Sequence, residues 1–522
     1  MKGKNRNADI PVGCALHGVS RRQFLAGCAA CAGAATFAGA PRWVRAAGRG
    51  PTIRIIYALH SAKQDRPDWP NKGFDFTPVM DEITAGLRAR FPESTFVSTL
   101  AAGEEETKKI LDVDGQRNID GYIVYRMNAW NRVAQTVVPT GKPVLYIDFQ
   151  YGGSGGFLVY SAGFIRAGAR NLGFVASSRR EDLYEAVKCF EPARDKGSSY
   201  DFAAAVSGAR IIGTPKPGDL SGKPDKIEKV PVEEAVRLMK ASKIIAVRGP
   251  EAEPGTTMMG IPVVYIPFSE LNGAWAAADM TESAKIADRW IKSAALVEGV
   301  SRDELVNSAA MYLGQKAVLK KHGANAITIN CLGGFYGGHI HAYPCLGFHE
   351  LLNEGLVGAC ECDVPSTAAM VAGAALTKGR PGYISDPVID TSKRQIIYAH
   401  CVASNRPFGP KGDAHPFEIL THSEDRQGAS VRSILPPGWM TTTIEISDPR
   451  KEIIFHQAKA VGNDPDDRAC RTKLAAEPKG DIEKLFTMWD KWGWHRVTFY
   501  GDLKEPVFGL AKALGWTVVE EA

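Results

Sequence analysis

The sequence predicts an α/β protein in which two Rossmann-like parallel-sheet domains are followed by a β-rich, barrel-like C-terminal domain. Three observations carry this prediction. The chain has 522 residues, more than one hydrophobic core accommodates. Short apolar strands alternate with helical segments through most of the chain, a pattern typical of parallel sheets with helical crossovers. From Gly382 onward, strand-like runs follow one another between Pro, Gly, Asn and Asp turns, which predicts an antiparallel sheet or small barrel.

The first segment has the composition of an export signal. Ser20-Arg21-Arg22-Gln23-Phe24-Leu25 has the form of a twin-arginine motif, and an Ala/Gly-rich apolar run follows it. No acidic residue lies between Asp9 and Gly50, which disfavours the alternative of an amphipathic or buried helix. A Gly-rich run of about 17 residues is short for a membrane span, so we expect no stable span in the mature form. The mature protein is therefore expected in the periplasm or secreted by the twin-arginine route.

These patterns divide the chain into four segments. We expect a twin-arginine signal peptide at 1–47, an N-terminal α/β domain at 48–168, a middle α/β domain at 169–372 and a β-rich domain at 373–522.

Composition excludes one class of partner. Hydrophobic residues make up 44% of the chain and charged residues 23%, which is ordinary for a globular protein. The net charge is only +5, and no Lys/Arg block is present, so we do not expect nucleic acid as a partner.

The elements of the first domain follow from apolar runs between turn residues. Strands are predicted at 52–59, 95–100, 121–125 and 143–149, and helices at 76–91 and 104–111. The run Gly152-Gly153-Ser154-Gly155-Gly156 lacks the lysine of a phosphate-binding loop and the G-x-G-x-x-G spacing. We therefore expect a flexible active-site or interface loop there.

The middle domain repeats the alternation. Strands are predicted at 209–213, 243–247, 262–266 and 326–330, and helices at 233–241 and, with breaks, at 281–318. The last strand runs into Cys331-Leu332-Gly333-Gly334. Strand ends that open into Gly-rich loops are where ligand sites of α/β sheets lie.

The C-terminal region is predicted to be mostly strands. Runs at 395–399, 430–435, 441–446 and 452–456 have strand character. The chain then closes with a helix at 482–489, a strand at 495–500, a helix at 506–514 and a strand at 516–519.

The number and spacing of the cysteines indicate no clear pattern of disulfide bonds. Of ten cysteines, three lie in the predicted signal peptide, which leaves an odd number of seven. Cys360 and Cys362 flank Glu361 too closely for a zinc knuckle. We expect them to be small buried residues.

The residues best suited to catalysis or metal binding lie around an Ala-rich helical segment. Glu361 precedes it, Asp386 follows it, and His400 ends the next strand-like run. Carboxylates and a histidine on element ends are suitable ligands for a divalent metal. Glu361 and Asp386 are 25 residues apart, far enough for a helix to return the chain so that the two face each other. Each residue alone could equally be structural.

Several motifs resemble those of the L-fucose isomerase and L-arabinose isomerase superfamily. The segment Gly358-Ala359-Cys360-Glu361-Cys362-Asp363 resembles its acidic motif, Ser385-Asp386 its second acidic ligand, and Tyr398-Ala399-His400-Cys401 its histidine-bearing strand. The segment Trp494-His495 through Tyr500-Gly501-Asp502 is similar to its His-His segment, with tryptophan in place of the first histidine.

The resemblance implies a function and a ligand set. It implies a divalent metal, most often Mn²⁺, held by Glu361, Asp386 and His495, with His400 as a fourth ligand or a near neighbour. It also implies aldose–ketose interconversion of a small sugar and a homo-oligomer, a trimer or hexamer. In such a reaction a metal stabilises the enediolate while carboxyl groups move the protons, and we assign that work to Glu361 and Asp386.

Other residues are candidates for substrate contact. His339 and His341 alternate, so they share a face if they lie on a strand, or line the pocket if they lie in a loop. Trp494 could stack on a sugar face or simply pack in the core.

The sequence thus predicts an exported, metal-dependent sugar isomerase-like protein. Two alternatives remain open: a non-catalytic periplasmic carbohydrate-binding protein on the same fold, and a related metal-assisted epimerase or lyase.

Overall fold

The computed structural model describes residues 50–128 and 130–522. The predicted signal peptide lies outside these residues, so it stays a prediction. The described residues belong to one unit, Gly48–Ala522, and the domain boundaries within it also stay predictions. Among the described residues, no helix combines the length and apolarity needed to cross a membrane.

The first sheet is parallel throughout and has the order β2-β1-β3-β4-β5. Its strands are β1 (Thr52–Ala58), β2 (Thr95–Ala101), β3 (Gly121–Arg126), β4 (Val144–Asp148) and β5 (Leu172–Val175). The strand β5 lies beyond residue 168, where we drew the end of the first domain. The helices of this region are α2 (Thr77–Arg90), α3 (Glu104–Gly115), α4 (Val133–Val137), α5 (Ser154–Arg166), α6 (Arg180–Val187), α7 (Phe190–Lys196) and α8 (Phe202–Gly213).

Two predictions in this region are wrong. The predicted strand 209–213 is the last turn of α8, where Ile212 is 87% exposed. The Asp201 side chain caps this helix by accepting from the Ala204 amide at 2.9 Å, and Phe202, Val206 and Arg210 face inward at helical spacing. The glycine run 152–156 is not a flexible loop, because α5 begins at Ser154.

The second sheet has the order β11-β10-β6-β8-β7, and only β7 is antiparallel to its neighbour. Its strands are β6 (Ile244–Val247), β7 (Thr256–Met258), β8 (Ile261–Ile266), β10 (Ala326–Ile329) and β11 (Val357–Ala359). The helices are α9 (Val232–Ala241), α10 (Phe268–Ala276), α11 (Met280–Ser293), α12 (Arg302–His322), α13 (Cys331–Tyr336), α14 (Cys345–Asn353) and α15 (Val364–Leu376). The predicted Gly-rich loop after β10 is therefore the start of the short helix α13.

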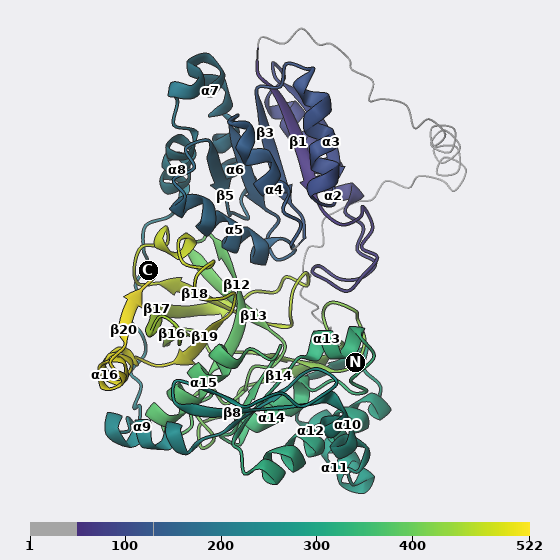
Figure 1. The fold of residues 1–522 in the computed structure, drawn as a ribbon, viewed down its shortest axis with the longest axis vertical. Helices are drawn as coiled ribbons and strands as arrows, with labels where there is room; N and C mark the ends of the chain where they lie inside the picture. The colour runs from purple at the N-terminus through teal and green to yellow at the C-terminus, as the bar shows by residue number, and fades with distance from the viewer. Residues whose placement is uncertain (1–49, 129) are drawn as a thin grey trace, which may run out of the picture. The chain divides into compact units, whose positions relative to one another are not determined.

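The C-terminal region contains a closed antiparallel barrel of six strands, which confirms the predicted fold class. The order is β16-β19-β12-β13-β18-β17, and pairing between β16 and β17 closes it. The strands are β12 (Tyr383–Asp390), β13 (Gln395–His400), β16 (Met440–Ser447), β17 (Glu452–Asn463), β18 (Thr472–Pro478) and β19 (Arg496–Tyr500). Figure 1 shows these strands gathered together in green and yellow.

The remaining C-terminal elements lie outside the barrel. The strand β20 (Thr517–Glu520) pairs in parallel with β17, and α16 (Lys504–Leu514) precedes it. The strand β15 (Ser430–Ser433) belongs to a separate small sheet with β14 (Phe417–Leu420) and β9 (Leu296–Glu298). The predicted helix 482–489 is reduced to the 3₁₀ turn η3 (Lys484–Phe486).

The barrel shares hydrophobic cores with both parallel sheets. One core joins Ile56 and Phe157 of the first region to Ile389 and Tyr398 of the barrel. A second core joins the second sheet and the inward face of α15 to barrel strands β12, β13, β16 and β17. Because α15 packs on both β10 and β16, the turn between β11 and α15 lies beside the barrel.

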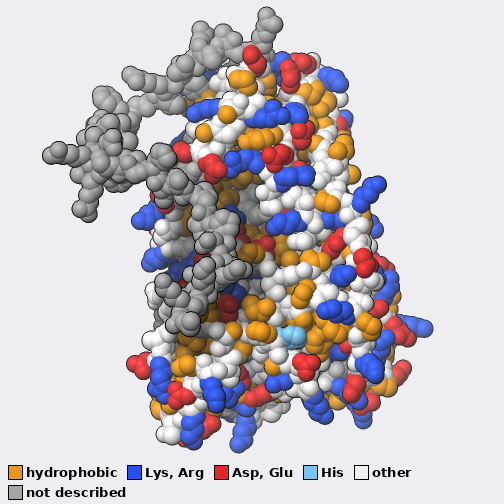
Figure 2. Space-filling view, turned by 180° about the vertical axis from the view of Figure 1, so that it is seen from behind, with side chains coloured by type: hydrophobic (Ala, Val, Ile, Leu, Met, Phe, Trp, Pro, Cys, Tyr) orange, Lys and Arg blue, Asp and Glu red, His pale blue; other side chains and the backbone are white. Residues whose placement is uncertain are grey.

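Charge is distributed evenly over the surface that Figure 2 shows. Blue and red side chains are interspersed across the described residues of this face, with no large patch of either sign. This distribution agrees with the small net charge of +5.

Candidate metal centre

Four side chains converge at the point where the second sheet meets the barrel. Glu361, Asp386, His400 and His495 each offer one ligand atom, and these atoms all lie within 4.8 Å of one another. The structure therefore brings together the four residues that the sequence predicts as metal ligands.

The barrel register places three of the four. His400 is the last residue of β13 and His495 immediately precedes β19, on either side of β12, which carries Asp386. The antiparallel register pairs Asp386 with Ala399 on one side and Ser385 with Arg496 on the other. Each histidine is one residue beyond a paired position, so both lie at the end of the barrel where Asp386 lies.

Glu361 comes from outside the barrel. It lies in the turn between β11 and α15 with φ of 62°, and Cys362 follows with φ of 55°. This left-handed conformation is uncommon for residues with a side chain and is found preferentially at functional sites. The helix α15 begins at Val364, so Glu361 lies in the turn that precedes it.

The side chains of the cluster make ion-pair contacts of 3.1 to 3.9 Å with one another. His495 Nε2 lies 3.1 Å from Asp386 Oδ1 and 3.4 Å from Glu361 Oε2. His400 Nε2 lies 3.7 Å from Glu361 Oε1 and 3.9 Å from Asp386 Oδ2. The side chains of Asp386, His400 and His495 are at most 7% exposed, whereas Glu361 is 27% exposed and reaches solvent.

Unpartnered polar atoms show that the cluster fits a cation. Asp386 Oδ1, His400 Nε2 and His495 Nε2 are buried, and none makes a well-aligned hydrogen bond to a described residue. Leaving buried polar atoms without partners costs about 1–3 kcal/mol each. Two carboxylates and imidazole nitrogens form a donor set typical of Mn²⁺ and similar divalent ions, so the residues present fit such a group.

Asp363 fixes the orientation of His495. Its Oδ2 lies 2.8 Å from His495 Nδ1, and because a carboxylate only accepts, Nδ1 carries the proton. The Nε2 atom is thereby turned toward Glu361 and Asp386, the carboxylate–histidine arrangement that orients metal ligands. Asp363 also caps α15, since its Oδ1 accepts from the Ser366 amide at 2.9 Å.

His400 has the opposite proton arrangement. Its Nδ1 accepts a hydrogen bond from the Cys401 backbone N–H at 3.0 Å. A neutral ring in this position carries its proton on Nε2, the atom that faces the two carboxylates. His400 is therefore arranged to donate a proton or hydrogen bond, whereas His495 is arranged to ligate.

Electrostatics keep the Glu361 carboxylate ionised. Burial alone would raise the pKa of Glu361, but the hydrogen bond with His495 and the charge of that imidazolium lower it to about 2. Burial opposes a charge on His495, yet its contacts with Asp363 and Asp386 raise its pKa well above the ordinary value. A proton and a divalent cation would thus compete for His495 Nε2.

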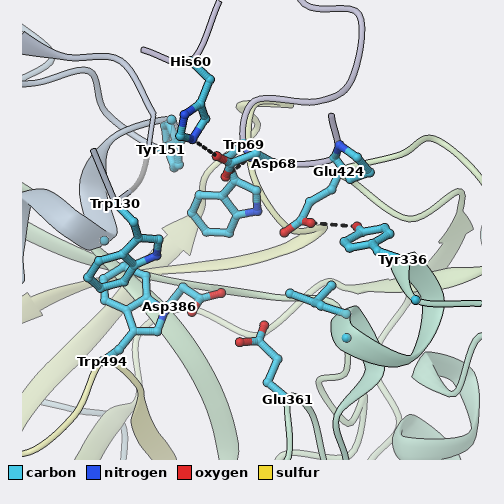
Figure 3. A pocket seen from close by; sticks show the side chains of 16 residues that line it. His60, Asp68, Trp69, Trp130, Tyr151, Tyr336, Glu361, Asp386, Glu424 and Trp494 are labelled. Carbon is cyan, nitrogen blue, oxygen red and sulfur yellow. Dashed lines mark hydrogen bonds and ion pairs between the residues drawn. The ribbon is translucent and has the colours of Figure 1, made fainter. Parts of the chain in front are cut away.

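The cluster opens into a pocket of about 420 Å³. Figure 3 shows the carboxylates of Glu361 and Asp386 pointing into this space, with Glu424 on the opposite wall. The other labelled side chains that line it are His60, Asp68, Trp69, Trp130, Tyr151, Tyr336 and Trp494. Sequence reasoning singled out only Trp494 among these wall residues, because they come from loops far apart in the chain.

Glu424 is the chemically most distinctive wall residue that sequence reasoning missed. Burial raises the pKa of its carboxyl to about 8, although the charge of His422 partly opposes this. Its Oε2 accepts a hydrogen bond from the Tyr336 hydroxyl at 2.8 Å. At neutral pH the pocket therefore presents a neutral carboxylic acid across from the ionised Glu361.

Trp494 lines the pocket beside Trp130, with ring centroids 6.2 Å apart in an edge-to-face arrangement. A Cβ at position 155 would collide with the six-membered ring of Trp494, so Gly155 at the start of α5 allows this close approach. The glycine run of the first domain thus contributes to the pocket wall.

His339 and His341 lie elsewhere. The His339 ring stacks on Phe268 with centroids 5.6 Å apart, and His341 packs against Trp275 at 5.7 Å. Neither residue lines the pocket. Substrate contact by these histidines stays a prediction.

Comparison with known proteins gives a local similarity to a sugar isomerase. No family model matches the chain. Two proteins named sulfoquinovose isomerase, from Priestia aryabhattai and Priestia megaterium, are each 28% identical to it over 131 residues. The match covers 23% of this chain and 28% of each relative, so it spans less than a third of their length.

Comparison of structures adds nothing on function. A chain described as transcription regulator CcpA of Lactococcus lactis aligns over 63% of this chain and 92% of its own length, with 10% identity and a TM-score of 0.16. A superposition this loose carries no argument. The similarity that bears on function is therefore the one to a sugar isomerase.

Proposed function

We propose that this protein is a metal-dependent isomerase that interconverts an aldose and a ketose. The observation that carries the proposal is the set of unpartnered, buried atoms of Asp386, His400 and His495 beside Glu361, at the wall of a pocket. The local similarity to sulfoquinovose isomerase supports a sugar as substrate.

The proposed metal ligands are Glu361, Asp386 and His495. Bound there, a divalent cation such as Mn²⁺ would polarise the carbonyl and hydroxyl oxygens of the substrate and stabilise negative charge that develops between them. The proton arrangement of the two histidines makes His495 the ligand, and it makes His400 a hydrogen-bond donor beside the ligands.

The proton transfers require a base and an acid near adjacent substrate carbons. Glu361 is ionised and reaches the pocket, so its carboxylate is available to accept a proton there, and we assign it the removal of the carbon-bound proton. Asp386 remains its proposed partner. Glu424 offers a neutral acid from the opposite wall, where it can donate to a substrate oxygen.

The pocket walls favour an uncharged sugar. Trp69, Trp130, Tyr151 and Trp494 supply aromatic surface, on which the apolar faces of sugars pack well. The polar groups are mainly the carboxyls of Asp68, Glu361, Asp386 and Glu424, and no lysine or arginine is among the described residues that line the pocket. Because Glu424 is neutral at pH 7, an anionic sugar would meet like charge from the other carboxylates there.

Three further features of the proposal rest on the sequence and its resemblance alone. They are export by the twin-arginine route, assembly into a trimer or hexamer, and manganese as the metal. Metal analysis of protein recovered from the periplasmic fraction, combined with light scattering, tests all three.

A screen of aldoses with the purified, Mn²⁺-loaded protein tests the activity. We expect ketose formation from at least one uncharged aldose, and a loss of about 10³-fold or more in Glu361→Gln, because both the proposed base and a proposed metal ligand are removed. The surface variant Glu505→Gln is the matched control, since that side chain is 87% exposed. Sugar binding without turnover, unchanged in Glu361→Gln, would instead identify a carbohydrate-binding protein. Inversion at one carbon without ketose formation would identify an epimerase.

A further inference from the structure

Two buried thiols lie next to each other behind the pocket wall. The Sγ atoms of Cys331 and Cys360 are 3.0 Å apart, and the two residues are 2% and 4% exposed. This separation is about 1 Å longer than a disulfide bond. The pair lies outside the set of residues to which the proposed activity assigns a role.

The sheet fixes the relative positions of the two cysteines. Cys331 is the first residue of α13 after β10, and Cys360 follows β11, the parallel neighbour of β10. The Thr328 hydroxyl donates to the Cys360 carbonyl at 3.3 Å, and the Cys362 amide donates to the Ile329 carbonyl at 2.9 Å. The two thiols therefore meet because their backbones are held in register.

The residues next to each thiol line the pocket. Leu332 and Gly333 follow Cys331, and Glu361 follows Cys360, and all three contribute to the pocket wall. Each thiol is thus one position along the chain from a residue of the pocket wall. A covalent bond between the thiols would tie α13 to the turn that carries Glu361.

We propose that Cys331 and Cys360 form a disulfide bond under oxidising conditions and so fasten α13 to the Glu361 turn. The oxidant is a small disulfide that reacts by thiol–disulfide exchange. One cysteine thiolate attacks the oxidant and releases one thiol, and the second cysteine then attacks the resulting mixed disulfide and releases the other. In total, two protein thiols become one disulfide, and the oxidant disulfide is reduced to two thiols that take up the protons.

A second pair of buried cysteines lies away from the Glu361 turn. Cys401 and Cys470 contact each other, and the Ser423 hydroxyl lies 4.0 Å and 3.5 Å from their sulfurs. Cys189 lies on the first-sheet side of the chain, near Tyr200. Cys189 therefore provides a control position that is unrelated to the pocket.

Peptide mapping of the full chain tests the proposal directly. The protein is incubated with oxidised glutathione, its remaining thiols are alkylated in denaturant, and it is cleaved after glutamate. Cleavage after Glu354 and Glu361 releases 355–361, whose only cysteine is Cys360, while 305–350 carries Cys331 and Cys345. We expect 355–361 linked to 305–350, with fragmentation placing the link at Cys331, and no link after treatment with dithiothreitol.

Cysteine variants distinguish the effect of the Cys331–Cys360 disulfide from the effect of oxidation elsewhere in the protein. Oxidation should raise the Tm of the wild type by a few °C, because the bond restricts the unfolded chain. Cys331→Ser and Cys360→Ala should each lose this shift, and Cys189→Ser should keep it. The proposal is overturned if both thiols stay alkylatable, if only glutathione adducts form, or if Cys360 links to Cys345 or Cys362. The mapping needs only wild-type protein, so it decides the question even if a variant does not fold, and it does not depend on isomerase activity.

Discussion

His495 Nδ1 lies 2.8 Å from Asp363 Oδ2, although 132 residues separate the two in the chain. The same carboxyl group caps α15 through the Ser366 amide. One side chain therefore sets both the start of the helix and the direction of the histidine.

Asp363→Asn should weaken metal binding with little effect on folding. Asparagine caps helices as well as aspartate does, but it lacks the charge that holds the Nδ1 proton of His495. We expect an affinity for Mn²⁺ lower by about 10–100-fold, measured by calorimetric titration. Asp363→Ala should lose about 1 kcal/mol of stability as well, because the cap is removed. Equal loss of stability in both variants would contradict the separation of roles.

The two histidines should respond differently to substitution. His495→Gln should abolish Mn²⁺ binding, since it removes the nitrogen turned toward Glu361 and Asp386. His400→Gln should keep most of the affinity but reduce turnover, because His400 Nδ1 is engaged by the Cys401 amide and Nε2 is left as a donor. Electron paramagnetic resonance of bound Mn²⁺ measures the first effect and steady-state kinetics the second. Equal loss of metal in both variants would make His400 a ligand.

Gly155→Ala should disturb the aromatic wall without affecting the metal site. The added Cβ collides with Trp494, so we expect weaker sugar binding at unchanged affinity for Mn²⁺. Gly163→Ala in the same helix is the matched control, because its Cβ meets nothing closer than the Asp490 carboxylate at 3.9 Å. This control should gain up to about 1 kcal/mol from helix propensity. Unchanged sugar binding in Gly155→Ala would place the sugar away from Trp494.

The carboxyl of Glu424 should make stability depend on pH. Its pKa of about 8 in the folded protein exceeds the ordinary value of 4.5, so the folded state binds the proton more tightly than the unfolded state. The stabilisation is complete below about pH 4.5 and is lost as pH rises toward 8. Glu424→Gln removes this dependence, so its Tm relative to the wild type should rise between pH 5 and 8.

Glu445 provides a comparison for this experiment. Burial and the charge of Asp363 raise its pKa to about 8 as well, but it does not line the pocket. Glu445→Gln should therefore give a similar trend in Tm. Sugar binding should lose its pH dependence near 8 only in Glu424→Gln. A pH profile of binding shared by both variants would remove Glu424 from substrate contact.

The sequence predicted strands and helices most accurately where a single feature, such as an apolar run between turn residues, marked the segment. The strands β1 to β4 are apolar runs between turn residues, and each was predicted within one or two residues. The strand predicted at 209–213 was wrong because a short apolar run suits either a strand or a helix, and the cap at Asp201 decides for the helix. The segment predicted as a helix at 482–489 forms only a 3₁₀ turn, and its Trp489 side chain is buried.

The site was predictable only where its residues belong to motifs. Glu361, Asp386, His400 and His495 stand in segments with recognisable spacing, and the barrel register brings them together. Glu424 and Trp69 have no such signal, since loops bring them to the pocket from opposite ends of the chain. The proton positions on the two histidines likewise depend on contacts that no sequence pattern specifies.

Glu361 and the other three clustered residues come from different layers of the protein. Asp386 and His400 belong to adjacent barrel strands and His495 immediately precedes a third, while Glu361 follows the edge strand of a parallel sheet. An ion held by all of them would clamp two separately built layers of the protein to each other. Removal of the metal by a chelator should then weaken the contact between these two layers first. We expect limited proteolysis to cleave the β11–α15 turn before any strand of the barrel.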